Sequence, residues 1–494
     1  MQSRLKWLFF FVTILSVVSM AARVPLDTDM WWHIRSGEVM MSTHQPLLVD
    51  DFSYTLAGEP WINHSWLAQL VLAFLYRNLS YVGLMLYVVM LSVVTFALLF
   101  FLIEGHPFIR SLLIIFAGAV ISPVWSPRPQ LFTLLCLTLL VYLVDRYRKG
   151  SRAHSWFIPI LFLLWGNLHG GYFTGILFLI FSLLGFGFER WLGSGQNNFD
   201  NGQCWQLLKV TLISIPALLI NPNGLRILKV PFDTVNVRIL RDFIDEWASP
   251  DFHQPLQLLF LLLFLGTVFF MSVNQQRKSA VTVFPFLGFA VLAFIAKRNI
   301  APMMIVLLPL LSVQLKLWLE EVKWVQSVPE LFIEPNYGWK IRDDNPPVMK
   351  FINLFLIFLI GLVAAGKAIY VSHPIVVNAY LSQQVPVQAY QTLDTLSLSG
   401  NILNEYGWGG YQIFHHPQYP VFVDGRTDLY GDEVIGEWMG LMRADGDYAA
   451  ELEDYAINAV LLQQDRPLVN KLLSAGWQEQ YVDQASVLLV RPLP

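Results

Sequence analysis

The sequence predicts a polytopic α-helical membrane protein that ends in a small soluble α/β domain. Of its 494 residues, 55% are hydrophobic and only 14% are charged, and the mean hydropathy is +0.50. Soluble domains contain about 25% charged residues, so a soluble fold could not bury this much apolar surface. The net charge of -4 gives no indication of nucleic-acid binding. The two cysteines, Cys136 and Cys204, do not suggest a disulfide framework.

About eleven apolar segments are expected to cross the membrane, because a spanning helix needs about 20 mostly apolar residues. The first segment follows Arg4 and Lys6 and could be a secretory signal or a retained span. The many later spans favour a retained span. The expected spans are Leu5 to Ala22, Tyr81 to Ile103, Ile109 to Val124, Leu131 to Val144, Trp156 to Leu168, Phe173 to Phe188, Leu207 to Ile220, Leu256 to Met271, Ala280 to Ala296, Met303 to Leu317 and Val348 to Val371.

The basic residues orient these spans, since Lys and Arg in short loops accumulate on the cytoplasmic side. From a cytoplasmic N-terminus, the even-numbered spans return at Arg110, at Arg146, Arg148, Lys149 and Arg152, at Arg190, and at Arg277 and Lys278. The loops 23–80 and 221–255 and the tail from Ser372 then face outward. We therefore expect a multi-pass protein of the inner cell membrane, with a transmembrane domain at 1–371 and an extracytoplasmic domain at 372–494.

The tail has the pattern of a folded α/β domain. Strands are expected at the apolar runs Tyr419 to Val423, Ala459 to Leu462 and Ala485 to Val490. Helices are expected around Glu433 to Met442, Tyr448 to Tyr455 and Leu468 to Ala475. This alternation predicts a small α/β sandwich with a partly parallel sheet. No glycine-rich phosphate-binding loop appears in the tail.

The densest polar group in the sequence follows the first span, in the run from Asp27 to His33, Asp-Thr-Asp-Met-Trp-Trp-His. Ionisable groups at a membrane surface are costly unless they are paired or functional. If a helix begins near Asp27 or Thr28, Asp29 and His33 share one face, and a carboxylate could act as a general base. The alternative is that Asp27 caps the helix and the tryptophans form an interfacial belt. Two carboxylates could also hold a divalent cation.

Several motifs resemble a group of bacterial membrane proteins placed with the polytopic glycosyltransferases of the GT-C fold. The resemblance rests on the run from Asp27 to Leu70, Ser-Pro-Arg128-Pro-Gln, Asn167-Leu-His-Gly-Gly171, Gly407-Trp-Gly-Gly-Tyr411 and Val423-Asp-Gly-Arg-Thr-Asp428. The superfamily includes protein O-mannosyltransferases and lipid A aminosugar transferases. The resemblance implies a sugar donor on a polyprenyl phosphate and an acidic catalytic base in the first outward loop. That base would be Asp27 or Asp29. The better studied mannosyltransferases carry Asp-Glu where this chain has Asp-Thr-Asp, so both aspartates stay candidates.

Three cations are expected at the outer ends of spans, against the usual charge bias: Arg128, Lys297 and Arg298. Binding of a lipid phosphate would explain them, whereas snorkelling beside a carboxylate is the alternative. We also expect substrate contacts from His33, His64 and His169.

The histidine and the turn in two of the motifs have structural explanations as well. A packed, hydrogen-bonded histidine is an equal alternative for His169. In the turn of the tail, a structural pairing of Arg426 with Asp424 or Asp428 is favoured over catalysis.

These features lead to three functional hypotheses. The first is a membrane glycosyltransferase that moves a hexosyl or pentosyl group from a polyprenyl-phosphate-linked sugar to a cell-envelope acceptor at the outer face. The second is a transporter or flippase of lipid-linked intermediates, which would carry charges within spans and repeated interrupted helices that the sequence lacks. The third is a non-catalytic assembly protein. Convergence of Asp27, Asp29, His33 and Arg298 on one cavity would favour the first hypothesis.

Overall fold

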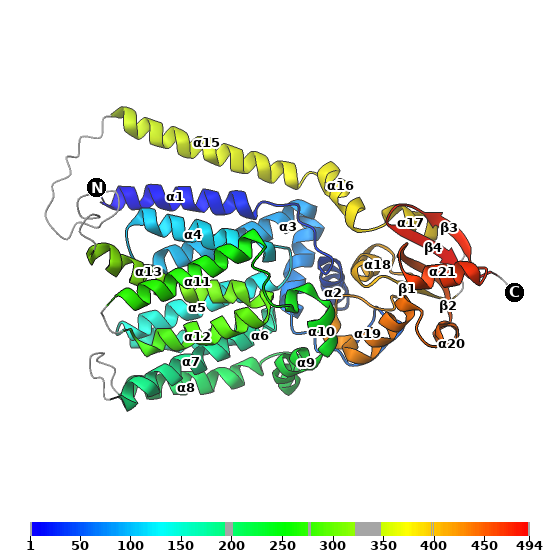
Figure 1. Cartoon of the computed structure of the whole chain (residues 1–494), viewed down its shortest axis with the longest axis horizontal. Helices are drawn as coiled ribbons and strands as arrows, with labels where there is room; N and C mark the ends of the chain where they lie inside the picture. Colours follow the sequence, from blue (N-terminus) through cyan, green and yellow to red (C-terminus); the bar gives the residue numbers. More distant parts are fainter. Residues whose placement is uncertain are drawn as a thin grey trace. The chain divides into compact units, whose positions relative to one another are not determined.

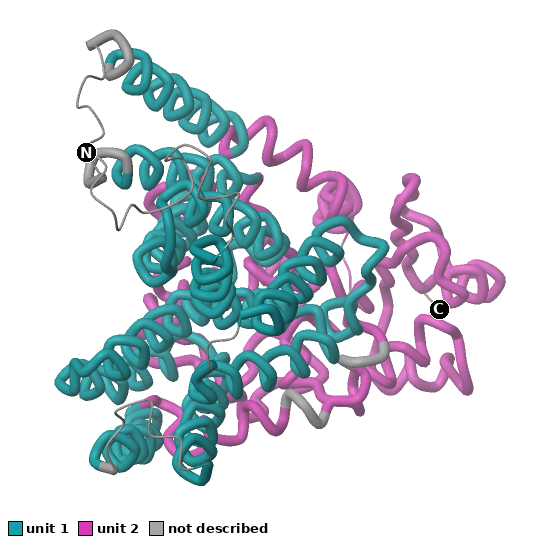
Figure 2. The backbone as a smooth tube through the Cα atoms, turned by 60° about the vertical axis from the view of Figure 1, so that its left-hand side comes forward, with its two compact units in different colours: residues 1–23, 85–220, 245–371 teal, residues 24–84, 221–244, 372–494 magenta. Residues whose placement is uncertain are grey.

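The computed structural model describes residues 2–192, 201–274, 278–321, 347–396, 398 and 400–492. The chain folds as two compact units, each assembled from segments that are distant in sequence (Figure 2). Unit 1 comprises residues 1–23, 85–220 and 245–371, and unit 2 comprises residues 24–84, 221–244 and 372–494. The expected tail domain, 372–494, therefore lies in unit 2 together with residues 24–84 of the first loop.

Unit 1 is helical, and its long helices run side by side (Figure 1). Its helices are α1 (Gln2–Ala21), the second part of α3 (Trp66–Leu102), α4 (Pro107–Ile121), α5 (Gln130–Arg148), α6 (Phe157–Leu168), α7 (Tyr172–Trp191), α8 (Asn201–Leu218), α11 (Pro255–Val273), α12 (Ala280–Ile295), α13 (Ile300–Glu321) and α15 (Pro347–Val371). Short 3-10 turns add η1 (Ser122–Val124), η2 (Arg152–Trp156), η4 (Asp245–Trp247) and η5 (Lys297–Asn299). Helices satisfy their backbone polar groups internally, which is required in lipid.

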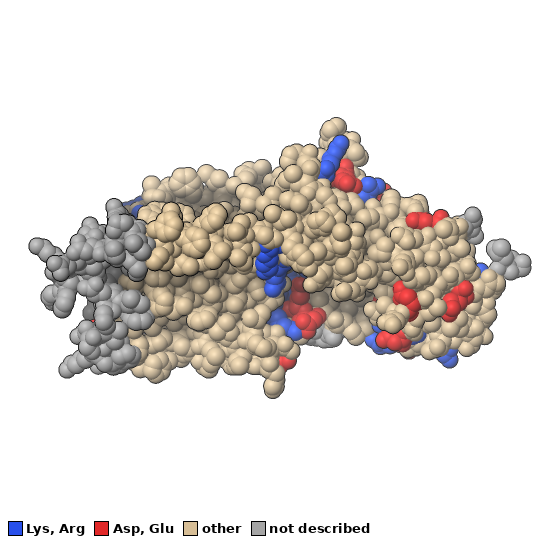
Figure 3. All heavy atoms as spheres, turned by 90° about the horizontal axis from the view of Figure 1, so that it is seen from above, with Lys and Arg blue, Asp and Glu red and all other residues tan. Residues whose placement is uncertain are grey.

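Seven helices of the described residues are long and apolar enough to cross a membrane, and two shorter ones, Lys6–Ala21 and Ala280–Ile295, are also apolar. Helices α6 and α8 coincide with expected spans but are not among these nine, so the count of eleven stays a prediction. The expected span from Tyr81 begins where α3 kinks, at Ser80, whose φ of 50° is not helical. On the face drawn in Figure 3, the surface over the unit 1 helices is almost entirely uncharged.

Unit 2 contains a four-stranded sheet in the order β1-β2-β4-β3. Its strands are β1 (Asn401–Asn404), β2 (Ile457–Gln463), β3 (Gln478–Val482) and β4 (Ser486–Val490). Strand β1 pairs with β2 in parallel, while β4 pairs with β2 and β3 in antiparallel register. The prediction of an α/β tail with a partly parallel sheet is confirmed, and two of the expected strands correspond to β2 and β4.

The strand expected at Tyr419 to Val423 is wrong. Only Val421 forms a bridge there, in isolation and with Ser53 of the first loop. The Val421 N–H donates to the Phe52 carbonyl at 3.0 Å, and the Val421 carbonyl accepts from the Tyr54 N–H at 3.1 Å. The apolar run is therefore bound to a loop far away in sequence and does not join the sheet.

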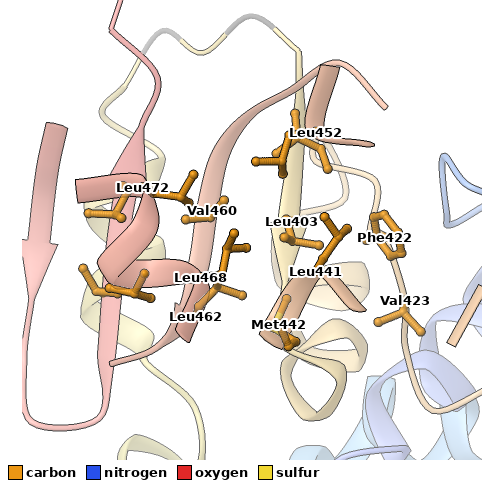
Figure 4. Packing of buried hydrophobic residues seen from close by; sticks show 14 of the residues in the cluster. Leu403, Phe422, Val423, Leu441, Met442, Leu452, Val460, Leu462, Leu468 and Leu472 are labelled. Carbon is orange, nitrogen blue, oxygen red and sulfur yellow. The ribbon is translucent and has the colours of Figure 1, made fainter. Parts of the chain in front are cut away.

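Unit 2 also contains helices from the first loop, from residues 221–244 and from the tail. They are α2 (Met30–Thr43), the first part of α3, α9 (Val230–Asn236), α10 (Arg238–Phe243), α16 (Pro374–Gln384), α17 (Val387–Leu393), α18 (Gly409–His415), α19 (Thr427–Arg443), α20 (Tyr448–Asp454) and α21 (Pro467–Ser474). The three expected tail helices correspond to α19, α20 and α21. Buried residues of the sheet and of α19, α20 and α21 form the core, with Leu403, Leu441 and Leu468 fully buried (Figure 4).

Candidate functional site

Two aspartates form the start of helix α2 in unit 2. Asp27 Oδ1 accepts a hydrogen bond from the Asp29 N–H at 2.9 Å, and Asp29 is the N-cap residue. The Asp29 carbonyl accepts from the His33 N–H at 3.3 Å. The helix begins at Met30, so the expected start near Asp27 or Thr28 was too early, because Asp27 forms a local turn before the helix. Both aspartates therefore lie beside the N-terminus of α2, where the helix dipole favours negative charge.

Glycines of the tail motifs pack directly against this helix start. A Cβ atom built on Gly425 would overlap Asp29 Oδ1 and would lie 2.8 Å from Asp29 Cγ and 3.1 Å from Trp32 Nε1. A Cβ atom on Gly410 would overlap the Thr28 carbonyl oxygen. Both positions require glycine because the tail backbone approaches the Asp-Thr-Asp segment so closely. The tail thus fixes the surroundings of Asp29, which the sequence alone did not indicate.

Behind this contact, Arg426 is fully buried in an ion cluster. Its Nη1 donates to Asp50 Oδ1 at 2.6 Å, and its Nε and Nη2 donate to the two oxygens of Asp424 at 2.9 and 2.6 Å. Nη2 also donates to the Tyr430 hydroxyl at 3.1 Å. Burial lowers the pKa of Arg426, but the interactions with Asp424, with Tyr430 and then with Asp50 outweigh it, so this pKa is raised above its ordinary value. The expected structural pairing of Arg426 with Asp424 is confirmed.

Two histidines of the first loop, His33 and His64, have polar partners within unit 2. His33 Nδ1 lies 3.3 Å from Gln69 Nε2, and Gln69 Oε1 accepts from Asn63 Nδ2 at 2.7 Å. His64 Nδ1 lies 2.8 Å from Ser65 Oγ, and its Nε2 lies 3.8 Å from Asp428 Oδ2. These contacts orient both rings. A role of His33 and His64 in substrate binding stays a prediction.

Unit 1 contains a cavity of about 500 Å³. Apolar residues such as Val120, Leu134 and Ile300 form much of its wall. His169, Lys297 and Arg298, three of the residues expected to contact substrate, also line it. The structure therefore brings together side chains from segments more than 100 residues apart, from the end of α6 and from η5. An apolar cavity with a few convergent polar groups is the usual form of a small-molecule site.

The short segment η4 supplies partners to the cations at this cavity. Lys297 Nζ lies 2.5 Å from Asp245 Oδ1, and Arg128 Nη1 lies 3.1 Å from Glu246 Oε1. Asp245 and Glu246 line the cavity, so Arg128 is joined to its edge through Glu246.

Arg298 has a different environment. Its Cζ lies 4.3 Å from the centre of the Trp247 ring, in the geometry of a cation–π contact. Sequence reasoning did not identify the residues of η4 as part of a site.

His169 is held by hydrogen bonds at the end of α6. Its Nδ1 accepts from the Gly171 N–H at 3.0 Å and lies 2.8 Å from Thr133 Oγ1. The Trp165 indole N–H donates to the same Thr133 oxygen at 3.0 Å. Because Nδ1 is an acceptor in this arrangement, we assign the proton of the neutral ring to Nε2. His169 is thus a packed, hydrogen-bonded histidine that also forms part of the cavity wall. A contact between His169 and a substrate stays a prediction.

The expected site residues are divided between the units. Asp27, Asp29, His33 and His64 belong to unit 2, and Arg128, His169, Lys297 and Arg298 belong to unit 1. In the part of the chain that the structure describes, no three His, Cys, Asp or Glu side chains form a group that could hold a metal ion. Binding of a divalent cation by the two aspartates stays a prediction.

Solved structures place this architecture among known folds. The oligosaccharyltransferase AglB of Archaeoglobus fulgidus, in complex with an inhibitory peptide and a dolichol-phosphate, is similar with a TM-score of 0.58 and 10% identity, over 92% of this chain and 69% of that one. ArnT of Cupriavidus metallidurans in the apo state is similar with a TM-score of 0.50 and 12% identity. This match covers 98% of this chain and 97% of the ArnT chain. Both are GT-C glycosyltransferases. This chain has the GT-C fold. No protein-family model and no curated relative matches the sequence.

The similarity to these structures extends over both parts of the chain. The expected architecture, a polytopic helical membrane protein with a C-terminal α/β domain, is confirmed. The match to ArnT extends over nearly the whole of both chains, so it includes the tail as well as the helices.

Proposed function

We propose that this GT-C protein is a glycosyltransferase that moves a sugar from a polyprenyl-phosphate donor to an acceptor hydroxyl. The observation that supports this most directly is the composition of the unit 1 cavity, in which Lys297, Arg298 and His169 stand among apolar walls. A lipid-linked phosphate presents the same combination of an apolar chain and an anionic head. The AglB structure contains a dolichol-phosphate, which is a ligand of this class.

Each polar group of the cavity has a role in this proposal. The guanidinium of Arg298, oriented by Trp247, donates two parallel hydrogen bonds to the phosphate. Lys297, which is paired with Asp245, adds to the positive potential around the phosphate, and the Nε2–H of His169 donates to a further phosphate oxygen. As the glycosidic bond breaks, negative charge grows on the departing phosphate oxygen. These donors stabilise that charge more strongly than they stabilise the intact donor.

We propose Asp27 and Asp29 as the candidates for the general base. In the reaction, one carboxylate takes the proton of an acceptor hydroxyl, and the acceptor oxygen forms a bond to the anomeric carbon of the donor sugar. The bond between that carbon and the phosphate oxygen breaks, and the lipid phosphate leaves with the electron pair. Direct displacement of this kind inverts the anomeric configuration. Asp27 Oδ1 also accepts the Asp29 N–H, which fixes this carboxylate at the start of α2.

The same proposal includes the topology. The protein is a multi-pass membrane protein, and we place its N-terminus in the cytoplasm and the segments of unit 2 outside the inner membrane. The acceptor is then a component of the cell envelope, since it must reach the outer face.

The test is a transfer assay with purified protein, a panel of radiolabelled polyprenyl-phosphate sugars and a membrane extract as the source of acceptor. Transfer of label from at least one donor is expected for the wild type, together with its loss in Asp27→Asn or Asp29→Asn. Asp51→Asn is the matched control, because Asp51 is an exposed carboxylate of the same loop. Full transfer by both Asp27→Asn and Asp29→Asn would remove these residues from the reaction.

A further inference from the structure

The cations at the unit 1 cavity differ in how their charge is balanced. Lys297 is paired with Asp245, and Arg128 with Glu246. Among the described residues, the guanidinium of Arg298 forms no ion pair with a carboxylate. It lies against the ring of Trp247, and the charge of Glu246 also acts on it without forming an ion pair. Three cations therefore face two carboxylates, which leaves one guanidinium unneutralised by an ion pair.

The exposure of the acids indicates what these pairs do. The Asp245 side chain is 90% exposed and that of Glu246 is 45% exposed, whereas Lys297 and Arg128 are 19% and 23% exposed. Ion pairs with such exposed partners contribute little to folding stability. Their main effect is on the electrostatic potential of the cavity, where each carboxylate cancels a cation that a ligand phosphate would otherwise use.

We propose that Asp245 and Glu246 are specificity-determining residues of the donor cavity. By holding Lys297 and Arg128, they leave Arg298 as the one cation for tight phosphate contact, and so they select a lipid that carries one phosphate over a lipid that carries two. This inference rests on the proposed function, because it takes the cavity to be the donor site.

The physical basis is the cost of an extra unpaired charge. A single phosphate matches the fork of one guanidinium, which can donate two hydrogen bonds to it. A diphosphate brings at least one further negative charge, which would have to displace a carboxylate from Lys297 or Arg128 or remain close to it. Both outcomes reduce affinity, because an ion pair is lost in the first and like charges lie close together in the second.

The experiment compares two lipids with the same tail, undecaprenyl phosphate and undecaprenyl diphosphate, by native mass spectrometry of the purified full-length protein. For the wild type we expect the monophosphate to bind at least about tenfold more tightly, which corresponds to about 1.4 kcal/mol. In Asp245→Asn and in Glu246→Gln the diphosphate should gain affinity, so that this ratio falls. Asp251→Asn is the control, because its carboxylate contacts His253 and is exposed, and its ratio should stay at the wild-type value.

The outcomes separate this inference from the proposed function. If the wild type binds both lipids equally, or the diphosphate more tightly, the selection by Asp245 and Glu246 is wrong while the donor site stands. If both variants lose affinity for both lipids, the acids support the site structurally and the inference fails. If the wild type binds neither lipid, the cavity is not a site for lipid phosphates and the proposed function fails with the inference.

Discussion

Arg426→Met tests the energetic role of the buried ion cluster in unit 2. The side chains of Arg426, Asp50 and Asp424 are all 0% exposed. Methionine keeps much of the volume but leaves two carboxylates buried without their cation. Removing one partner of a buried pair costs about 3–5 kcal/mol, because the remaining charge is uncompensated. We therefore expect Arg426→Met to lower the free energy of unfolding of unit 2 by about that amount.

Thermal unfolding of the purified protein, followed by tryptophan fluorescence, measures this effect. For a unit of roughly 200 residues, 1 kcal/mol corresponds to about 2–4 °C in Tm, so a decrease between about 6 and 20 °C is expected. Arg443→Met is the control: its side chain is 54% exposed and lies 4.0 Å from Asp445, and such a change stays within about 0.5 kcal/mol. Replacing Asp50 and Asp424 by Asn in the Arg426→Met background should recover part of the loss. Wild-type melting of Arg426→Met would refute the buried-charge reasoning.

Two further substitutions test the surroundings of the candidate site. Gly425→Ala should reduce transfer by about 10- to 100-fold in a turnover assay, because the added Cβ displaces the Asp29 carboxylate and small misplacements of reacting groups are costly. Gly436→Ala is the control and should behave as wild type, since its added Cβ would lie 3.8 Å from the nearest atom. Equal activity of the two variants would contradict this prediction. Trp247→Ala should weaken binding of undecaprenyl phosphate by about 2- to 30-fold, which corresponds to the loss of a cation–π contact with Arg298. Unchanged affinity in an equilibrium binding measurement would show that the ring does not orient the guanidinium.

Much of the fold could be predicted because its strongest signals are local. The long apolar helices and the strands β2 and β4 each coincide with a continuous apolar run, which can be recognised from the local sequence alone. The edge strand β3 was missed because its sequence, Gln-Glu-Gln-Tyr-Val, is polar and mostly exposed. Strand β1 was missed because asparagines stand at both of its ends, Asn401 and Asn404. Helix α18 begins with Gly409 and Gly410, which disfavour helix in isolation and are present because the backbone must approach its neighbours closely.

The candidate site was predictable where a residue type conflicts with its position. Acids directly after an apolar span, and the cations Lys297 and Arg298 on the expected outer side, were conspicuous for this reason. Their partners were not, since those contacts are set by the tertiary fold. Arg426 contacts Asp50, which is 376 residues away in the sequence, and Arg128 contacts Glu246, which is 118 residues away. No local pattern in the sequence carries that information.

Binding of the donor phosphate in the unit 1 cavity is the central claim, and photo-crosslinking tests it most directly. A polyprenyl phosphate with a diazirine beside the phosphate would be bound to the purified protein, irradiated and mapped by mass spectrometry. We expect labelling of residues 297–302, which line the cavity, and its loss in Arg298→Met. Labelling confined to the outer, lipid-facing surfaces of the helices, with the same pattern in Arg298→Met, would contradict the claim.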